Sequence, residues 1–292
     1  MNNFEANYNK ILEILKTISP QENFLTQKRQ PRLKDIELIA MNLTSEYISI
    51  DSENHLFRII PECLRNKIER SVYNRRKRKL FTAIEFIRDK LSEKFNEFEN
   101  YYIVDSMPLE VAKLSRSKRS TICKESYLTA PNKGYCASQN MAYYGYKIHA
   151  VCSISGVFKS FDISKASVHD IHYLQDIKNQ FSHCVILGDK GYLSADYQLD
   201  LFETKKIKLE VPMRKNQTDY KKQSYIFKKS RKRIETLFSQ LCDHFMIRRN
   251  YAKTFNGFKT RILSKITSLT IIQYINKFVF DRNINNLKIN IV

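Results

Sequence analysis

The stretch CVILGDKG at residues 184–191 decides the fold of the larger part of this chain. Its first four residues are apolar without a break, which is typical of a strand that is buried on both faces of a sheet. Gly188 and Gly191 then predict a turn, so Asp189 directly follows the end of the strand. Open α/β sheets place their functional sites at the carboxyl ends of their strands. We therefore expect an α/β domain that brings Asp189 to its functional edge.

The segments around this strand predict the other elements of the same sheet. Apolar spacing predicts strands at residues 101–104, 146–152, 157–163 and 208–212, and helices at residues 168–180, 194–204 and 226–248. Ser155 and Gly156 favour a hairpin turn between the second and third of these strands. The long polar and basic stretch after Pro108 is interpreted as a loop or an insertion. Strands and helices in this order indicate an α/β fold with a mixed sheet.

The first part of the chain has a different pattern. Apolar residues at helical spacing predict helices over residues 11–18, 36–47, 56–68 and 80–95, with Pro61 as a point where the third can bend. We therefore divide the chain into an all-helical domain at residues 1–98 and an α/β domain at residues 99–292. The helical domain is compatible with a helix-turn-helix-like DNA-binding unit, and equally with a helical cap on the larger domain.

The charge of the chain points to a polyanionic partner. Its 292 residues include 50 Lys and Arg against 30 Asp and Glu, a formal net charge of +20. Part of this excess is what AT-rich coding produces, but the charges are also clustered. The run NRRKRK at residues 74–79 contains Arg75, Arg76 and Arg78, and residues 205–233 carry twelve basic side chains. Such clusters favour nucleic acid over the alternative, an anionic membrane surface, because no basic helix with an aromatic face is evident.

Cysteine spacing and hydropathy favour a cytoplasmic protein. The six cysteines are scattered and form no C-x-x-C pair, which argues against a zinc ribbon or a disulfide scaffold. The polar start of the chain, residues 1–14, lacks the pattern of a secretory signal. The late apolar stretch at residues 266–280 is interrupted by Gln273, Asn276 and Lys277. We interpret it as an amphipathic terminal helix.

Three acidic residues stand where an α/β fold would carry chemistry. Asp105 ends the first strand of the larger domain, Asp189 follows the buried strand, and Glu235 lies beside the apolar stripe of the long helix. Grouped carboxylates repel one another unless a cation neutralises them. Mg²⁺ or Mn²⁺ prefers such oxygen ligands, and a pair of these ions supports phosphodiester chemistry. Each acid also has an ordinary interpretation, as a turn residue for the two aspartates and as an ion-pair partner of Arg231 for Glu235.

Four segments, taken in order, resemble transposases of the insertion sequence 982 family, which are bacterial DDE transposases. They are YIVDSMP at 102–108, NKGYCAS at 132–138 with YGYKIHA at 144–150, LGDKGY at 187–192, and RKRIETLFSQL at 231–241. The resemblance extends over nearly the whole chain, including the region around residues 38–56. The ordered set is specific, although each segment alone is weak.

This resemblance implies a ribonuclease H-like catalytic domain at residues 99–292. In that fold the first Asp lies on the first strand, the second Asp after the fourth strand, and the Glu on a later helix. Asp105, Asp189 and Glu235 match these positions in order, and would act as catalytic residues and as ligands of Mg²⁺ or Mn²⁺. The family further implies cleavage at transposon ends and strand transfer into target double-stranded DNA. Because two ends must be brought together, we expect a homodimer on DNA.

The resemblance also suggests DNA contacts around the acids. Arg231 matches an Arg that precedes the Glu by four residues in related transposases, whereas Lys228 and Cys242 replace an expected Tyr and Lys. The candidate DNA-binding residues are Lys190, Lys228, Arg231 and Arg233 in the catalytic domain, and Arg75, Arg76 and Arg78 in the helical domain.

Several alternatives remain open at this point. A nuclease of the same fold would share the three acids without joining DNA strands, and a DNA-binding repressor would use them only structurally. His149 is interpreted as a core or cleft histidine, and Asp170 equally as a helix cap or as a catalytic helper. Tyr143 and Tyr144 are assigned to strand packing rather than to stacking on a base.

Overall fold

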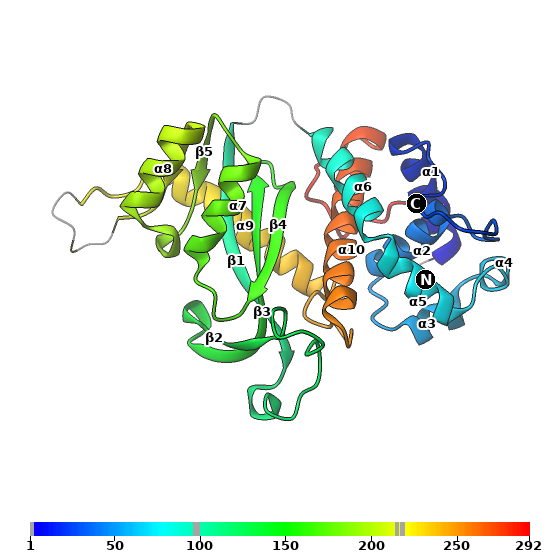
Figure 1. Cartoon of the computed structure of the whole chain (residues 1–292). Coiled ribbons are helices and arrows are strands. Elements are labelled where there is room, and N and C mark those ends of the chain that lie inside the picture. Colours follow the sequence, from blue (N-terminus) through cyan, green and yellow to red (C-terminus); the bar gives the residue numbers. More distant parts are fainter. Residues whose placement is uncertain (1–2, 96–99, 214–215, 217–219) are drawn as a thin grey trace. The chain divides into compact units, whose positions relative to one another are not determined.

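The computed structural model describes residues 3–95, 100–213, 216 and 220–292. The chain forms two compact units, and the colours of Figure 1 follow the sequence through them. The helical unit comprises residues 1–95 and 240–292, and the sheet unit comprises residues 96–239. The chain therefore leaves the helical unit, forms the sheet unit and returns.

The sheet unit contains a six-stranded mixed sheet. Its strands are β1 (Tyr101–Ala112), β2 (Asn132–Cys136), β3 (Met141–Ser153), β4 (Phe158–Lys165), β5 (Cys184–Leu187) and β6 (Ile207–Glu210). The order is β2-β3-β1-β5-β6, and β4 pairs with β3 beside this path. β1, β5 and β6 run parallel, whereas β2, β3 and β4 pair in antiparallel fashion. The predicted mixed α/β fold is thereby confirmed.

Helices cover both faces of this sheet. They are α7 (Tyr173–Gln180), α8 (Ala195–Lys205) and the long α9 (Tyr225–Asp243). Val104 and Val151 form a cross-strand pair and pack in one core with α7. The next residue along β3, Cys152, points to the opposite face and pairs with Phe158, whose ring lies 6.3 Å from that of Phe238 in α9. α7 and α9 thus lie on opposite faces (Figure 1).

The segment interpreted as a loop or an insertion contributes two pieces of sheet, which corrects that interpretation. β1 continues through Pro108 to Ala112, and β2 forms within the polar stretch. Pro108 is tolerated because β5 pairs only with residues 101–103, so among the described residues no strand pairs with that edge of β1 at Pro108. Gly145 allows β1 and β3 to approach, since a Cβ there would lie 2.1 Å from the Leu109 carbonyl oxygen.

The helical unit confirms the helices predicted for the amino-terminal segment. It contains α1 (Phe4–Ile18), α2 (Asp35–Tyr47), α3 (Glu53–Ile59), α4 (Glu62–Arg65), α5 (Arg70–Lys79) and α6 (Phe81–Glu93). The third predicted helix is split at Pro61, because a proline cannot donate the hydrogen bond that would continue α3. None of the helices in the described part of the chain has the length and apolar character to cross a membrane.

The centre of the helical unit is α10 (Phe255–Tyr274), which continues as a π-helical segment over Ile275–Val279. It is buried along almost its whole length, not on one face only, so the expectation of an amphipathic helix is wrong. Buried hydroxyl groups on this helix form hydrogen bonds with its own backbone. Thr267 and Thr270 each donate to a backbone carbonyl one helical turn earlier. Residues 240–292 therefore pack with the amino-terminal helices in one compact unit. The division into two functional domains between residues 98 and 99 stays a prediction.

Candidate active site

The parallel pairing of β1 and β5 places two predicted acids side by side. The last pair in this ladder is Ile103 with Leu187, and Asp105 and Asp189 each lie two residues beyond it. The two aspartates therefore occupy equivalent positions just beyond the β1–β5 ladder, Asp105 within the longer strand β1 and Asp189 directly after β5. Both side chains are partly buried. This is the edge at which open α/β sheets hold their ligands.

Backbone amides orient both carboxylates. The Asp105 Oδ1 atom accepts from the amide of Ser106 at 2.8 Å, and the Asp189 Oδ1 atom accepts from the amide of Gly191 at 2.7 Å. A Cβ at Gly191 would lie 2.9 Å from Asp189 Oδ1 and 3.4 Å from Asp170 Oδ2. The carboxylates of Asp170 and Asp189 thus flank the same bare α-carbon, and the turn function expected of Asp189 coexists with its place in this group.

The electrostatics of this edge favour a cation. The pKa of Asp105 is raised from 3.8 to about 7, mainly by burial, and the nearby charges of Asp189 and Asp170 contribute to this rise. The Ser106 amide and the Arg231 guanidinium act in the opposite direction. Asp105 therefore exchanges its proton near neutral pH. A divalent cation would relieve the repulsion within this group of oxygen donors.

Asp170 is held by a lysine that the sequence did not single out. The Lys147 Nζ atom donates to Asp170 Oδ1 at 2.7 Å and to the Val168 carbonyl at 3.0 Å. His149 lies beside this pair, with its Nδ1 atom 3.8 Å from Asp170 Oδ1 and its Nε2 atom 2.8 Å from the Ser164 hydroxyl. Strand alternation alone could have placed Lys147 and His149 on one face. Strand alternation could not have predicted that Asp170 joins them, because Asp170 lies in the segment that follows β4.

His149 makes the stability of the protein depend on pH in a defined direction. Its side chain is 2% exposed, and burial lowers its pKa from 6.5 to about 4; Lys147 also lowers it and Asp170 opposes the shift. Between these values the unfolded chain binds a proton that the folded chain does not. We therefore expect the free energy of unfolding to fall by about 1–3 kcal/mol as pH decreases from 7 to 4.

Urea unfolding of the wild type and of His149→Gln across this pH range measures the effect as a difference. The difference removes the contributions of other groups, including Asp105. The exposed His172 supplies the matched control, His172→Gln. Parallel pH profiles for wild type and His149→Gln would contradict the expected burial of a neutral imidazole.

Glu235 is the third acid that the sequence predicts as a metal ligand. It is exposed on α9, one helical turn after Arg231, which acts on the pKa of Asp105. Among the described residues, no three His, Cys, Asp or Glu side chains are arranged to hold a metal ion. The structure therefore brings Asp105 and Asp189 near Asp170 and Arg231, whose charges act on the pKa of Asp105, and the role of Glu235 as a third ligand stays a prediction. The oxygen donors at hand suit a hard divalent cation.

The predicted DNA-binding residues differ in their surroundings. Lys190, Lys228 and Arg75 are exposed, whereas Arg231, Arg233, Arg76 and Arg78 are partly buried. Arg76 is engaged internally: its guanidinium lies 2.5 Å from Asp35 Oδ1 and donates to the Leu33 carbonyl at 2.9 Å. The Asp35 side chain is fully buried, so Arg76 has a structural role in this ion pair, and its contact with DNA stays a prediction.

Comparison with known proteins agrees with the arrangement at this edge. A family model described as a transposase DDE domain matches residues 97–271. This match covers more than half of the chain, so the protein belongs to the DDE transposase domain family. Enzymes of this class process nucleic acid and generally depend on divalent metal ions, and the mixed sheet with its flanking helices is consistent with their ribonuclease H-like fold. A search of curated proteins gave no match.

Proposed function

We propose that the protein is a DNA transposase of the insertion sequence 982 family, which cleaves the ends of its element and joins them to target DNA. The observation that carries the proposal is that Asp105 and Asp189 each lie two residues beyond the last β1–β5 pair, where the pKa of Asp105 is raised to about 7. Carboxylates crowded in this way are typical of catalytic and metal-binding sites, since an isolated structural turn needs no such neighbour.

Asp105 and Asp189 are the proposed first two ligands of Mg²⁺ or Mn²⁺, and Glu235 is the proposed third. When bound, such ions activate the attacking oxygen and stabilise the leaving oxygen of a phosphodiester. Asp170 is neutralised by Lys147 at 2.7 Å, which sets it apart from the three ligands. Its contribution is to fix Lys147 and the loop that faces Gly191.

The cations around this edge supply the proposed contacts to DNA. Arg231 lies close enough to Asp105 to lower its pKa, so it can hold a phosphate next to the reacting group. Lys190, Lys228 and Arg233 are further proposed contacts in the sheet unit, and Arg75 and Arg78 are separate proposed contacts in the helical unit. Phosphate contacts of this kind set affinity and position without reading sequence. Two copies of the chain would hold the two ends of the element.

The decisive experiment is an assay of purified protein with labelled DNA that carries the flanking ends of its gene and a target plasmid. We expect Mg²⁺ or Mn²⁺ to stimulate cleavage at the ends and to give products joined to the plasmid. Cleavage without joined products would instead identify a nuclease. Binding without any metal-stimulated cleavage would identify a DNA-binding protein whose acids are structural.

A further inference from the structure

The helical unit has a pocket of its own, and none of the three proposed metal ligands lines it. It has a volume of about 350 Å³ and lies between α5 and the start of α10, so we call it the α5–α10 pocket. Its walls come from residues 51–54, from one face of α5 and from residues 251–261. Every lining residue belongs to the helical unit, and the volume is in the range of pockets that bind small ligands.

The pocket is lined by more cations than carboxylates. Five of its lining side chains are cations and two, Asp51 and Glu53, are carboxylates. Lys77 forms an ion pair with Glu53, with its Nζ atom 2.6 Å from the carboxylate. Arg70, Arg78 and Lys253 have no ion pair within the part of the chain that the structure describes. Three cations are thus available to an anionic ligand at one concave site.

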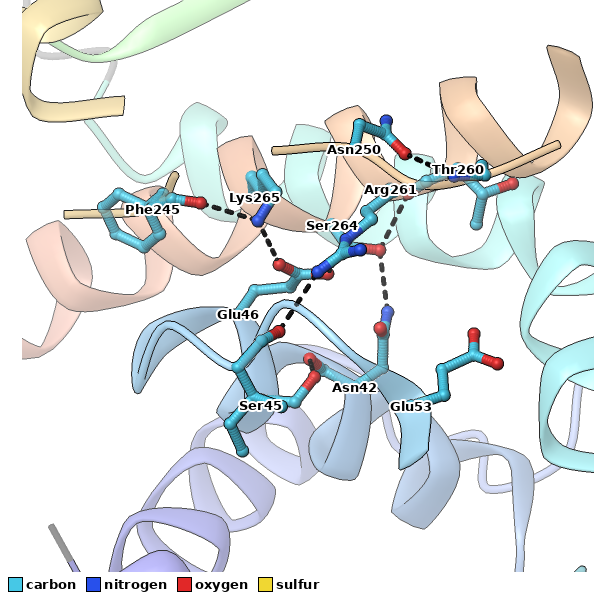
Figure 2. A network of polar contacts seen from close by, with 12 residues as sticks. Asn42, Ser45, Glu46, Glu53, Phe245, Asn250, Thr260, Arg261, Ser264 and Lys265 are labelled. Carbon is cyan, nitrogen blue, oxygen red and sulfur yellow. Dashed lines mark hydrogen bonds and ion pairs between the residues drawn. The ribbon is translucent and has the colours of Figure 1, made fainter. Parts of the chain in front are cut away.

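A buried network fixes the floor of this pocket (Figure 2). Arg261 lines the pocket and lies 3.3 Å from the carboxylate of Glu46, while its Nη2 atom donates to the Ile50 carbonyl at 3.1 Å. Glu46 also pairs with Lys265, whose Nζ atom donates to the Phe245 carbonyl at 2.6 Å. These contacts immobilise the Arg261 side chain before any ligand binds. A floor fixed in this way lowers the entropic cost of binding.

The mouth of the pocket adds an aromatic ring and a helix terminus. Tyr251 lines the pocket and is 61% exposed. Thr254 caps the twenty-residue helix α10 by accepting from the Gly257 amide at 3.2 Å, and both residues line the same pocket. The positive end of the α10 dipole therefore lies beside the three cations. A ring for a base and positive groups for a phosphate are the two parts that a nucleotide needs.

We propose that the α5–α10 pocket binds one unpaired nucleotide of the DNA on which the transposase acts, with its phosphate on Arg70, Arg78 and Lys253 and its base against Tyr251. The inference rests on the proposed function and names a ligand that this function does not require. A duplex presents its phosphates on a convex surface with every base stacked inside. A concave pocket with an aromatic ring at its mouth suits a nucleotide that has left the stack.

The test compares two fluorescein-labelled DNAs of the same duplex sequence, one blunt and one with a single-stranded extension of a few nucleotides. Fluorescence anisotropy with the full chain in EDTA measures binding without cleavage. We expect wild-type protein to bind the extended DNA about tenfold more tightly than the blunt DNA. Tyr251→Ala and Arg78→Gln should remove this preference, and Tyr251→Phe should keep it because the ring is retained.

Matched controls are Tyr127→Ala, an exposed aromatic residue of the sheet unit, and Arg58→Gln, an exposed cation of α3. Both should leave the preference unchanged. Equal affinity of the wild type for the two DNAs overturns the inference, and so does a preference that survives Tyr251→Ala. Because no metal is present, failure here is separate from failure of the cleavage assay, which tests the transposase function itself.

Discussion

Asp189→Asn is expected to lower the rate of metal-dependent DNA cleavage by more than about a thousandfold, because the amide cannot supply the negative charge that a divalent cation requires. Asn keeps the shape of the side chain and can still accept a hydrogen bond from the Gly191 amide, which Asp189 now receives at 2.7 Å. The turn after β5 should therefore form as before. Single-turnover cleavage of end-bearing DNA measures the loss, and circular dichroism verifies the fold.

Asp105→Asn should show the same loss by the same mechanism, without a loss of stability in metal-free protein. Burial already favours the neutral form of this side chain and holds its pKa at about 7, so a neutral amide suits the site. Asp196→Asn, in an exposed acid of the first turn of α8, is the matched control and should retain full activity. Cleavage near the wild-type rate by either active-site variant would refute the assigned roles.

Glu235→Gln tests the proposed ligand that the structure leaves exposed. The sequence could order the three acids along the chain but could not determine whether they converge. Asp105 and Asp189 converge because a parallel ladder of only three residue pairs fixes their relative register. The position of Glu235 depends on how α9 lies across the sheet, and Arg231 rather than Glu235 acts on the pKa of Asp105. Helical periodicity reports a buried stripe, not the rotation of the flanking residues toward a ligand.

The same limit separates the predictable parts of the fold from the others. CVIL at residues 184–187 is a strand in the structure because a continuous apolar run fits a strand with neighbours on both sides. β2 was missed because NKGYC has neither alternation nor an apolar run, and its pairing with β3 is what defines it. α10 was predicted as a helix but with the wrong environment. Its serines and threonines are polar, yet their hydroxyls donate hydrogen bonds to backbone carbonyls within the unit. These hydrogen bonds offset the cost of burying the hydroxyl groups.

Glu46→Gln is expected to cost about 3–5 kcal/mol of unfolding free energy, the second large effect that the structure predicts. Glu46 on α2 is 2% exposed and Lys265 on α10 is 1% exposed. Burial alone would raise the pKa of Glu46, yet Lys265 and Arg261 hold it below its ordinary value. Without the carboxylate, two cations remain side by side in the interior with no anion between them.

Urea denaturation of the full chain, followed by circular dichroism, measures this cost. Glu13→Gln, which removes the exposed pair between Lys10 and Glu13 at 3.1 Å, is the matched control and should cost less than about 1 kcal/mol. The double variant Glu46→Gln with Lys265→Met should recover part of the loss, because one uncompensated charge leaves with the lysine. A loss for Glu46→Gln no larger than that of Glu13→Gln would show that the pair is open to water.

The size of this effect bears on the organisation of the chain. Glu46 lies in the amino-terminal segment and Lys265 in the segment after the sheet unit, so their ion pair connects the two stretches that form the helical unit. If the pair contributes as expected, the amino-terminal helices depend on residues 240–292 for their stability. A fragment ending at residue 98 would then lack the partner of Glu46 and should unfold at much lower urea than the full chain. The DNA contacts proposed for α5 should consequently be tested in the full chain.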